Sequence, residues 1–176
     1  MKVEIVPYSS NWPVQFEAER SAIRNALGDY IAVAVHHIRS TAVAGLAAKP
    51  VINIILEVRS LEALDQSTMN LEYLGYEAMG EFGIQGRRYF RKGGENRTHQ
   101  IHAFEMGEQN IFRHLAFRDY LNHFPDSRAE YGALKSRLAL DFTHDIEAYC
   151  DGKDAFIKLH ELKAIAWIKE HGISCL

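Results

Sequence analysis

Two short runs of β-branched residues stand out in the hydrophobic pattern, at residues 31–38 (IAVAVHHI) and 51–58 (VINIILEV). Runs of this length and content predict two β-strands. The connection between them contains two helix-capping residues, Ser40 and Thr41, and ends at Pro50, which predicts a short helical turn. We therefore expect two neighbouring strands of one sheet. The residues expected to be buried on one face of the second strand are Ile52, Ile54 and Leu56.

Apolar residues at helical spacing predict helices on both sides of these strands. Residues 11–28 begin at a capping residue and end at a glycine, and leucines within residues 60–74 mark a second helix. Three more helices are expected in the last third, the first two separated by Pro125. Their apolar positions are Ile111, Leu115 and Leu121, then Tyr131, Leu134 and Leu138, and finally Phe156, Leu159, Leu162 and Ala166.

A second strand pattern lies in the middle of the chain. Residues 87–92 (RRYFRK) and 99–104 (HQIHAF) flank Gly93 and Gly94, as in an antiparallel pair. The order of helix, strands, helix, strands and helices is typical of an α+β fold. We predict a single domain, residues 1–176, with a mixed β-sheet, flanking helices and a C-terminal helical cover. We expect the chemistry where the sheet meets that cover.

The composition disfavours two classes of binding partner, nucleic acids and membrane surfaces. The chain has 176 residues, is 47% hydrophobic and carries a net charge of −3 with no charged tail, which disfavours general nucleic-acid binding and a membrane-surface role. No apolar run approaches the roughly 18 residues of a membrane helix, and the N-terminus is too polar for a signal peptide, so we expect a cytoplasmic protein. Cys150 and Cys175 lack metal-ligand spacing and are expected to be reduced thiols.

Five cations gather around the predicted hairpin: Arg87, Arg88, Arg91, Lys92 and Arg97. Because alternate residues of a strand point to opposite faces, Arg87 and Arg91 share one face, and Arg88 and Lys92 share the other. One such pair would bind phosphate. A solvated sheet edge protected by charge explains the same residues equally well.

The histidines do not define a metal site. His36 and His37 point to opposite faces of a strand, as do His99 and His102, so neither pair forms one metal-binding face. No metal ligand is assigned from the residues. A metal-dependent hydrolase built on these histidines is the least supported of the functions considered.

One segment carries a family resemblance. HHIRSTAVAGLAAKPVINI, residues 36–54, resembles the signature of the GrpB family, which typically reads EHIGSTAVPGLAAKPIIDI. PYSSNWPVQFEAE, GIQGRRYFRKGG and FRDYLNHFPDSRAEYGALKSRLA look like that family in the same order, as do the late residues Tyr149, Lys153, Phe156 and Ile157. The resemblance covers nearly the whole chain. It implies a fold similar to the nucleotidyltransferase superfamily.

That superfamily's chemistry implies roles for particular residues. A Gly-Ser turn at a helix start grips a triphosphate, and acidic residues on a following strand hold Mg²⁺ between the phosphates. Here Ser40 and Thr41 match the turn, but Arg39 replaces its glycine and would either block a phosphate or bind it. Asn53 replaces the aspartate and weakens any Mg²⁺ site. On the same face only Glu57 is a carboxylate, about 13 Å further along.

Two further positions follow from the same resemblance. His102 stands on a later strand where a nucleotidyltransferase often places another acid, and imidazole is not a preferred Mg²⁺ ligand. Arg118 and Lys135 fall in family-like motifs, although ion pairs between helices explain them equally well. Lys49 precedes a proline at a loop end and is either a phosphate ligand or a solvated side chain.

Two hypotheses result. The first is a nucleotide- or phosphometabolite-binding protein of nucleotidyltransferase-like fold, able in principle to transfer a nucleotidyl group. The second is a non-catalytic binding or regulatory module that recognises a phosphorylated ligand. The candidate catalytic residues are Ser40 and Asn53, and the candidate binding residues are Arg39, Thr41, Lys49, Arg87, Arg88, His102, Arg118 and Lys135. The identity of the ligand, the oligomeric state and the presence of catalysis are left open.

Overall fold

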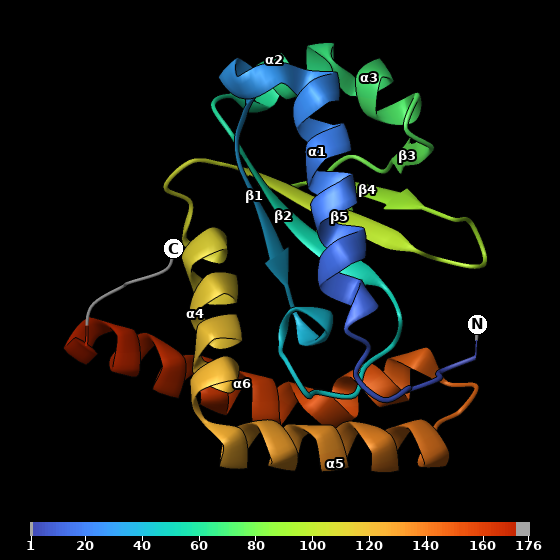
Figure 1. The fold of residues 1–176 in the computed structure, drawn as a ribbon, viewed down its shortest axis with the longest axis vertical. Helices are drawn as coiled ribbons and strands as arrows, with labels where there is room; N and C mark the ends of the chain where they lie inside the picture. The colour runs from blue at the N-terminus through green and yellow to red at the C-terminus, as the bar shows by residue number, and fades with distance from the viewer. Residues whose placement is uncertain (1, 172–176) are drawn as a thin grey trace. The chain divides into compact units, whose positions relative to one another are not determined.

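The computed structural model describes residues 2–171, and its elements are shown in Figure 1. The helices of this part of the chain are α1 (Asn11–Ile31), α2 (Leu61–Gln66), α3 (Thr68–Glu72), α4 (Gln109–His123), α5 (Pro125–Asp141) and α6 (Ile146–His171), with a 3₁₀ turn, η1, at Ser40–Ala42. The strands are β1 (Ala32–Ile38), β2 (Ile52–Val58), β3 (Tyr76–Ala78), β4 (Arg88–Lys92) and β5 (His99–Glu105).

The strands of the described residues form one mixed five-stranded sheet in the order β1-β2-β5-β4-β3. β2 and β5 run parallel, and the other neighbouring pairs are antiparallel. The predicted α+β class and the predicted pairing of β1 with β2 are both confirmed. Ile52, Ile54 and Leu56 are buried as expected, and Ile55 on the opposite face is buried as well.

Three local predictions need correction. The predicted end of the first helix at Gly28 is instead a kink, with φ 77° and ψ 160°, after which the chain continues to Ile31. The single helix expected over residues 60–74 is two short helices, because Ser67 leaves the helical conformation with φ −111° and ψ 12°. β3 was missed because it has three residues, of which only Tyr76 is buried, too few to show an alternating pattern.

The chain divides into two compact units that interleave in the sequence. The sheet unit contains Ser10–Ile38 and Val51–Phe112, and the helical unit contains, of the described residues, 2–9, Arg39–Pro50 and 113–171. In the sheet unit α1 lies along the sheet (Figure 1), and the Phe16 ring stacks on His37 of β1 with centroids 4.8 Å apart.

The helical unit is held together by α5 and α6. The rings of Tyr131 and Phe156 stack at 4.9 Å between these helices. Leu138 and Tyr149 form a buried cluster with Val3, and Val6 pairs with Ala48 in an isolated bridge. The N-terminal segment and the 39–50 connection are therefore built into the same unit as the last two helices.

None of the helices within residues 2–171 combines the length and apolar character that a membrane span requires. Cys150 is an exposed free thiol. Cys175 lies outside the described residues.

Candidate functional site

The turn η1 carries the first group of predicted site residues. The amides of Ala42 and Val43 donate to the carbonyls of Arg39 and Ser40, at 3.0 and 3.1 Å, which closes the turn. Thr41 is buried, Ser40 is half-buried and Arg39 is exposed. The short helical turn predicted here is confirmed.

Arg39 has a backbone conformation that favours glycine. Its φ of 63° and ψ of −160° lie in a region that other residues rarely adopt, at a cost of about 1–3 kcal/mol. The GrpB signature has a glycine at this position. The turn therefore keeps a glycine-like geometry although its side chain is a guanidinium.

This strain gives a prediction for two substitutions. Arg39→Gly and Arg39→Ala both remove the guanidinium, but only glycine relieves the backbone. The greater freedom of glycine in the unfolded chain lowers stability by about 0.5–1 kcal/mol and offsets part of the relieved strain. We therefore expect the unfolding free energy of Arg39→Gly to exceed that of Arg39→Ala by about 1 kcal/mol. Urea denaturation of the two variants measures the difference, and equal stabilities would show that Arg39 is not strained.

Lys135 of α5 reaches the same turn. Its ammonium donates a hydrogen bond of 2.8 Å to Ser40 Oγ and another to the Ala47 carbonyl, and it lies 4.8 Å from the centre of the Tyr131 ring. The side chain is only 2% exposed. No ion pair among the described residues includes Lys135. A buried ammonium held by neutral acceptors alone is costly.

A second lysine repeats this arrangement on α6. Lys153 Nζ lies 4.2 Å from the centre of the ring of Tyr149, four residues earlier, just as Lys135 lies over Tyr131. Residues four apart share a helix face. The two helices thus each present a tyrosine and a lysine from the patterns YGALK and YCDGK.

Both lysines have lowered pKa values, and Lys153 contributes to the shift at Lys135. Burial, reinforced by the charge of Lys153, lowers the pKa of Lys135 to about 7. Burial also lowers the pKa of Lys153 to about 8, with Arg39 and Lys49 adding to the effect and Cys150 opposing it. Arg39 and Lys49 thus act electrostatically on Lys153, and Lys153 acts on Lys135, so the four cations are linked through their charges. We call them the cation cluster: Arg39, Lys49, Lys135 and Lys153.

Tyr131 connects the cluster to Ser40. Burial raises the pKa of Tyr131 to about 12, while Arg39 and a hydrogen bond with Ser40 act in the opposite direction. The phenol is therefore neutral at physiological pH. Ser40 consequently has two side-chain partners, the Lys135 ammonium and the Tyr131 hydroxyl.

Acidic side chains of α4 and α6 pair with other cations. Arg118 donates to its neighbour Asp119 at 2.8 Å, and Arg113 donates to Glu161 at 2.7 Å. The ion pair of Arg118 with Asp119 lies within α4.

The remaining candidates belong to the sheet unit, where Asn53, His102 and Arg87 form a chain. Asn53 Oδ1 lies 3.2 Å from His102 Nε2, and His102 Nδ1 lies 3.4 Å from Arg87 Nη1. A guanidinium only donates, so Nδ1 accepts and Nε2 carries the proton. His102 then donates to Asn53 Oδ1, and Asn53 Nδ2 donates to the Val51 carbonyl. The imidazole is a neutral connector between an amide and a cation.

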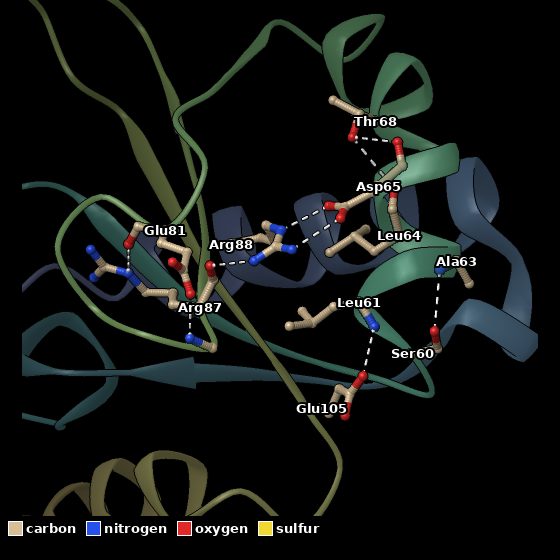
Figure 2. A network of polar contacts seen from close by, with 11 residues as sticks. Ser60, Leu61, Ala63, Leu64, Asp65, Thr68, Glu81, Arg87, Arg88 and Glu105 are labelled. Atoms are coloured by element: carbon tan, nitrogen blue, oxygen red, sulfur yellow. Dashed lines mark hydrogen bonds and ion pairs between the residues drawn. The ribbon is translucent and has the colours of Figure 1, made fainter.

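The two arginines of the hairpin have separate partners, as strand alternation predicts. Arg88 makes two hydrogen bonds to the Asp65 carboxylate of α2, at 2.8 and 3.0 Å (Figure 2). Arg87 donates to the carbonyls of Glu81 and Phe82, at 3.2 and 2.7 Å. The Glu81 carboxylate accepts a hydrogen bond of 2.6 Å from the Gly86 amide, which fixes the loop before β4.

Mg²⁺ is the cofactor that the resemblance implies, and it requires hard oxygen ligands, usually carboxylates. Around Asn53 the partners are an imidazole and, beyond it, a guanidinium, and Glu57 of the same strand is bonded to His36. Within residues 2–171 no group of three or more His, Cys, Asp or Glu side chains is arranged so that it could hold a metal ion. These residues do not fit Mg²⁺, and no step is assigned to a metal.

Sequence reasoning missed part of the cluster. Ser40 and Lys135 were both predicted site residues, and the fold brings these residues, 95 positions apart, into contact. Lys153, Tyr131 and Tyr149 were not assigned to a site. The repeated spacing of a tyrosine four residues before a lysine is the signal that marks them.

The matching family model, described as GrpB protein, covers residues 2–163. The chain therefore belongs to the GrpB family.

Similar proteins extend this assignment. The chain is 45% identical over 168 residues to the UPF0157 protein YqkA of Bacillus subtilis, covering 96% of this chain and 49% of that protein. The crystal structure of conserved protein GrpB from Enterococcus faecalis matches with a TM-score of 0.89 and 43% identity, covering 93% of this chain and 98% of the other. A dephospho-CoA kinase of Mycolicibacterium paratuberculosis is 27% identical over 97% of this chain. The chain spans about half the length of YqkA and of that kinase.

Proposed function

We propose that this protein binds a phosphorylated small molecule, a nucleotide or a phosphometabolite, at the cation cluster beside Ser40. The observation that carries the proposal is the buried Lys135 ammonium, which touches Ser40 Oγ and has Lys153 as its charged neighbour. The nucleotidyltransferase-like fold implied by the resemblance supports the same location, since there the serine turn grips phosphate.

Electrostatics favours an anionic ligand. Two lysines with lowered pKa values mark a place where positive charge is crowded and poorly solvated. A phosphate dianion would offset the crowded positive charge of the cluster and accept several hydrogen bonds. The guanidinium of Arg39 adds a planar pair of donors suited to phosphate oxygens. Strongly perturbed groups of this kind concentrate at functional sites.

We propose further that binding does not require Mg²⁺. The chain from Asn53 through His102 to Arg87 puts a cation near the position that would hold the metal. This favours a binding or regulatory module over a metal-dependent nucleotidyltransferase. The name dephospho-CoA kinase belongs to a protein that acts on a phosphorylated compound, which agrees with a ligand of this class.

Thermal unfolding in the presence of ligand tests the proposal. Inorganic phosphate, ATP and coenzyme A, each with Mg²⁺ and with EDTA, are compared with chloride at equal ionic strength. At a ligand concentration 100 times Kd, the stabilisation is about 2.7 kcal/mol. We expect at least one phosphorylated ligand to raise Tm equally with and without Mg²⁺.

A matched pair of lysines on α6 provides the control. Lys153→Gln removes a cation of the cluster, whereas Lys158→Gln removes an exposed lysine paired with Asp154. We expect Lys153→Gln to abolish most of the ligand-induced shift and Lys158→Gln to retain it. Equal shifts in the two variants would place the anion elsewhere and contradict the proposal.

A further inference from the structure

Ser40 and Lys135 are arranged as a nucleophile and its base. The 2.8 Å between Ser40 Oγ and Lys135 Nζ is hydrogen-bond distance, and Lys135 is held in place by the Ala47 carbonyl and the Tyr131 ring. When the amine is neutral, it keeps an N–H for the Ala47 carbonyl and turns its lone pair to the Ser40 hydroxyl. A serine activated by a buried lysine is a known solution for nucleophilic catalysis.

We propose that Ser40 is a nucleophile that attacks the phosphorus of a phosphate ester or anhydride, with Lys135 as the general base. The inference rests on the proposed function, because the cation cluster must first bind the phosphoryl group. The Ser40 Oγ–P bond forms as the bond from phosphorus to the leaving oxygen breaks. The hydroxyl proton passes to Lys135 Nζ and then to the leaving oxygen. The product is a phosphoryl or nucleotidyl ester of Ser40, which water or an acceptor hydroxyl cleaves in the reverse sense.

The cluster supplies the charge that such a step needs. Attack on phosphorus builds negative charge on the non-bridging oxygens, which metal ions neutralise in many enzymes. Here Lys153, Arg39 and Lys49 are the other cations of the cluster. In the proposed step these cations take the place of a divalent ion, since the residues around Asn53 do not fit Mg²⁺.

Lys135 is the group placed to accept the proton. Burial raises the pKa of Tyr131 to about 12, so its phenol stays protonated at neutral pH and is not a base. The ammonium of Lys153 lies over the ring of Tyr149, whereas the ammonium of Lys135 contacts Ser40 directly. With a pKa of about 7, half of Lys135 is deprotonated at neutral pH.

An alkyl fluorophosphonate tests the step, since it presents a tetrahedral phosphorus with fluoride as leaving group. After incubation of the protein with the probe, intact mass measurement detects the adduct and peptide mapping locates it. We expect one adduct at Ser40, slowed by inorganic phosphate. Ser40→Ala is expected to abolish it, and Ser127→Ala, which changes another serine of the helical unit, to leave it unchanged.

The pH profile separates general-base catalysis from simple exposure of the serine. We expect the labelling rate to rise with pH and to level off above about pH 7, where Lys135 has lost its proton. Lys153→Arg, which keeps the charge but does not titrate in this range, should retain the inflection. Lys135→Arg should reduce the rate about a hundredfold or more, the usual contribution of a general base.

The outcomes distinguish the two proposals. If phosphate stabilises the protein but Ser40 is not labelled, the nucleophile is excluded and the binding function stands. If Ser40 is labelled at a rate that is independent of pH, Lys135 is excluded as its base. If neither phosphate stabilisation nor labelling occurs, both proposals fail. Labelling of Ser40 that persists in a folded Lys135→Arg variant would remove Lys135 as the base. Should that variant not fold, the wild-type pH profile alone decides.

Discussion

Replacing Lys135 with methionine is expected to abolish phosphate-induced stabilisation and to raise the free energy of unfolding at pH 7 by about 2 kcal/mol. The lowering of the Lys135 pKa from 10.5 to about 7 means that the buried ammonium costs about 4 kcal/mol at pH 7. Methionine removes that cost and fills similar space. The loss of the two hydrogen bonds of Lys135 lowers the gain in unfolding free energy by about 2 kcal/mol. Urea denaturation and a phosphate titration measure the two effects.

The advantage of Lys135→Met should depend on pH. A lysine with a lowered folded-state pKa binds fewer protons in the folded state, so wild-type stability rises as pH increases from about 7 towards 10.5. At pH 9 the cost falls to about 2 kcal/mol, and the variant should then match the wild type. Lys158→Met, at an exposed site, should change stability by less than about 0.5 kcal/mol at either pH. A variant that is less stable than wild type at pH 7 would show that the lysine's hydrogen bonds outweigh its burial.

This prediction bears on why the lysine is present. Costly groups of this kind cluster at functional sites, where the rest of the fold offsets their cost. Arg39 is costly as well, because its backbone φ of 63° is strained and glycine would relieve that strain. Two costly features of different physical origin thus meet at Ser40, which supports placing the function there.

Most of the fold could be predicted from local pattern. The β-branched runs of β1 and β2 and the helices after residue 109 are long and periodic enough for side-chain spacing to specify them. The break at Ser67 and the strand β3 could not be predicted, because each depends on a few residues whose partners are distant in sequence. Tyr76, for example, is fixed by its hydroxyl, which donates to Glu19 of α1 at 2.7 Å.

The candidate site was predicted less completely, for a physical reason. The resemblance indicated Ser40 and Lys135 separately, but the pairing of α5 with the 39–50 connection is a tertiary contact. Arg88 shows the converse, because its charge suggested a ligand clamp while the fold supplies Asp65 as its partner. A charged residue in a sequence predicts that it pairs with an opposite charge. It does not show whether that charge belongs to another residue of the protein or to a ligand.

The last prediction concerns the metal position that the resemblance implies. Replacing both Asn53 and His102 with aspartate is expected to make the protein bind Mg²⁺, with a stabilisation of about 1–3 kcal/mol at 10 to 100 times Kd. The side chains of these residues approach to 3.2 Å, so two carboxylates there would repel each other, and a divalent cation would relieve the repulsion. Thermal unfolding with increasing Mg²⁺ measures the effect.

The single variants are the matched controls. In Asn53→Asp the new carboxylate accepts from His102, and in His102→Asp it lies near Arg87, so neither creates a repulsion for Mg²⁺ to relieve. We expect both singles and the wild type to be insensitive to Mg²⁺. A double variant that folds without gaining Mg²⁺ dependence would show that these strands do not form the metal position of a nucleotidyltransferase-like site. A wild type that binds nucleotide only with Mg²⁺ would contradict the metal-free mechanism itself, because the cation cluster would then be insufficient to neutralise the phosphates.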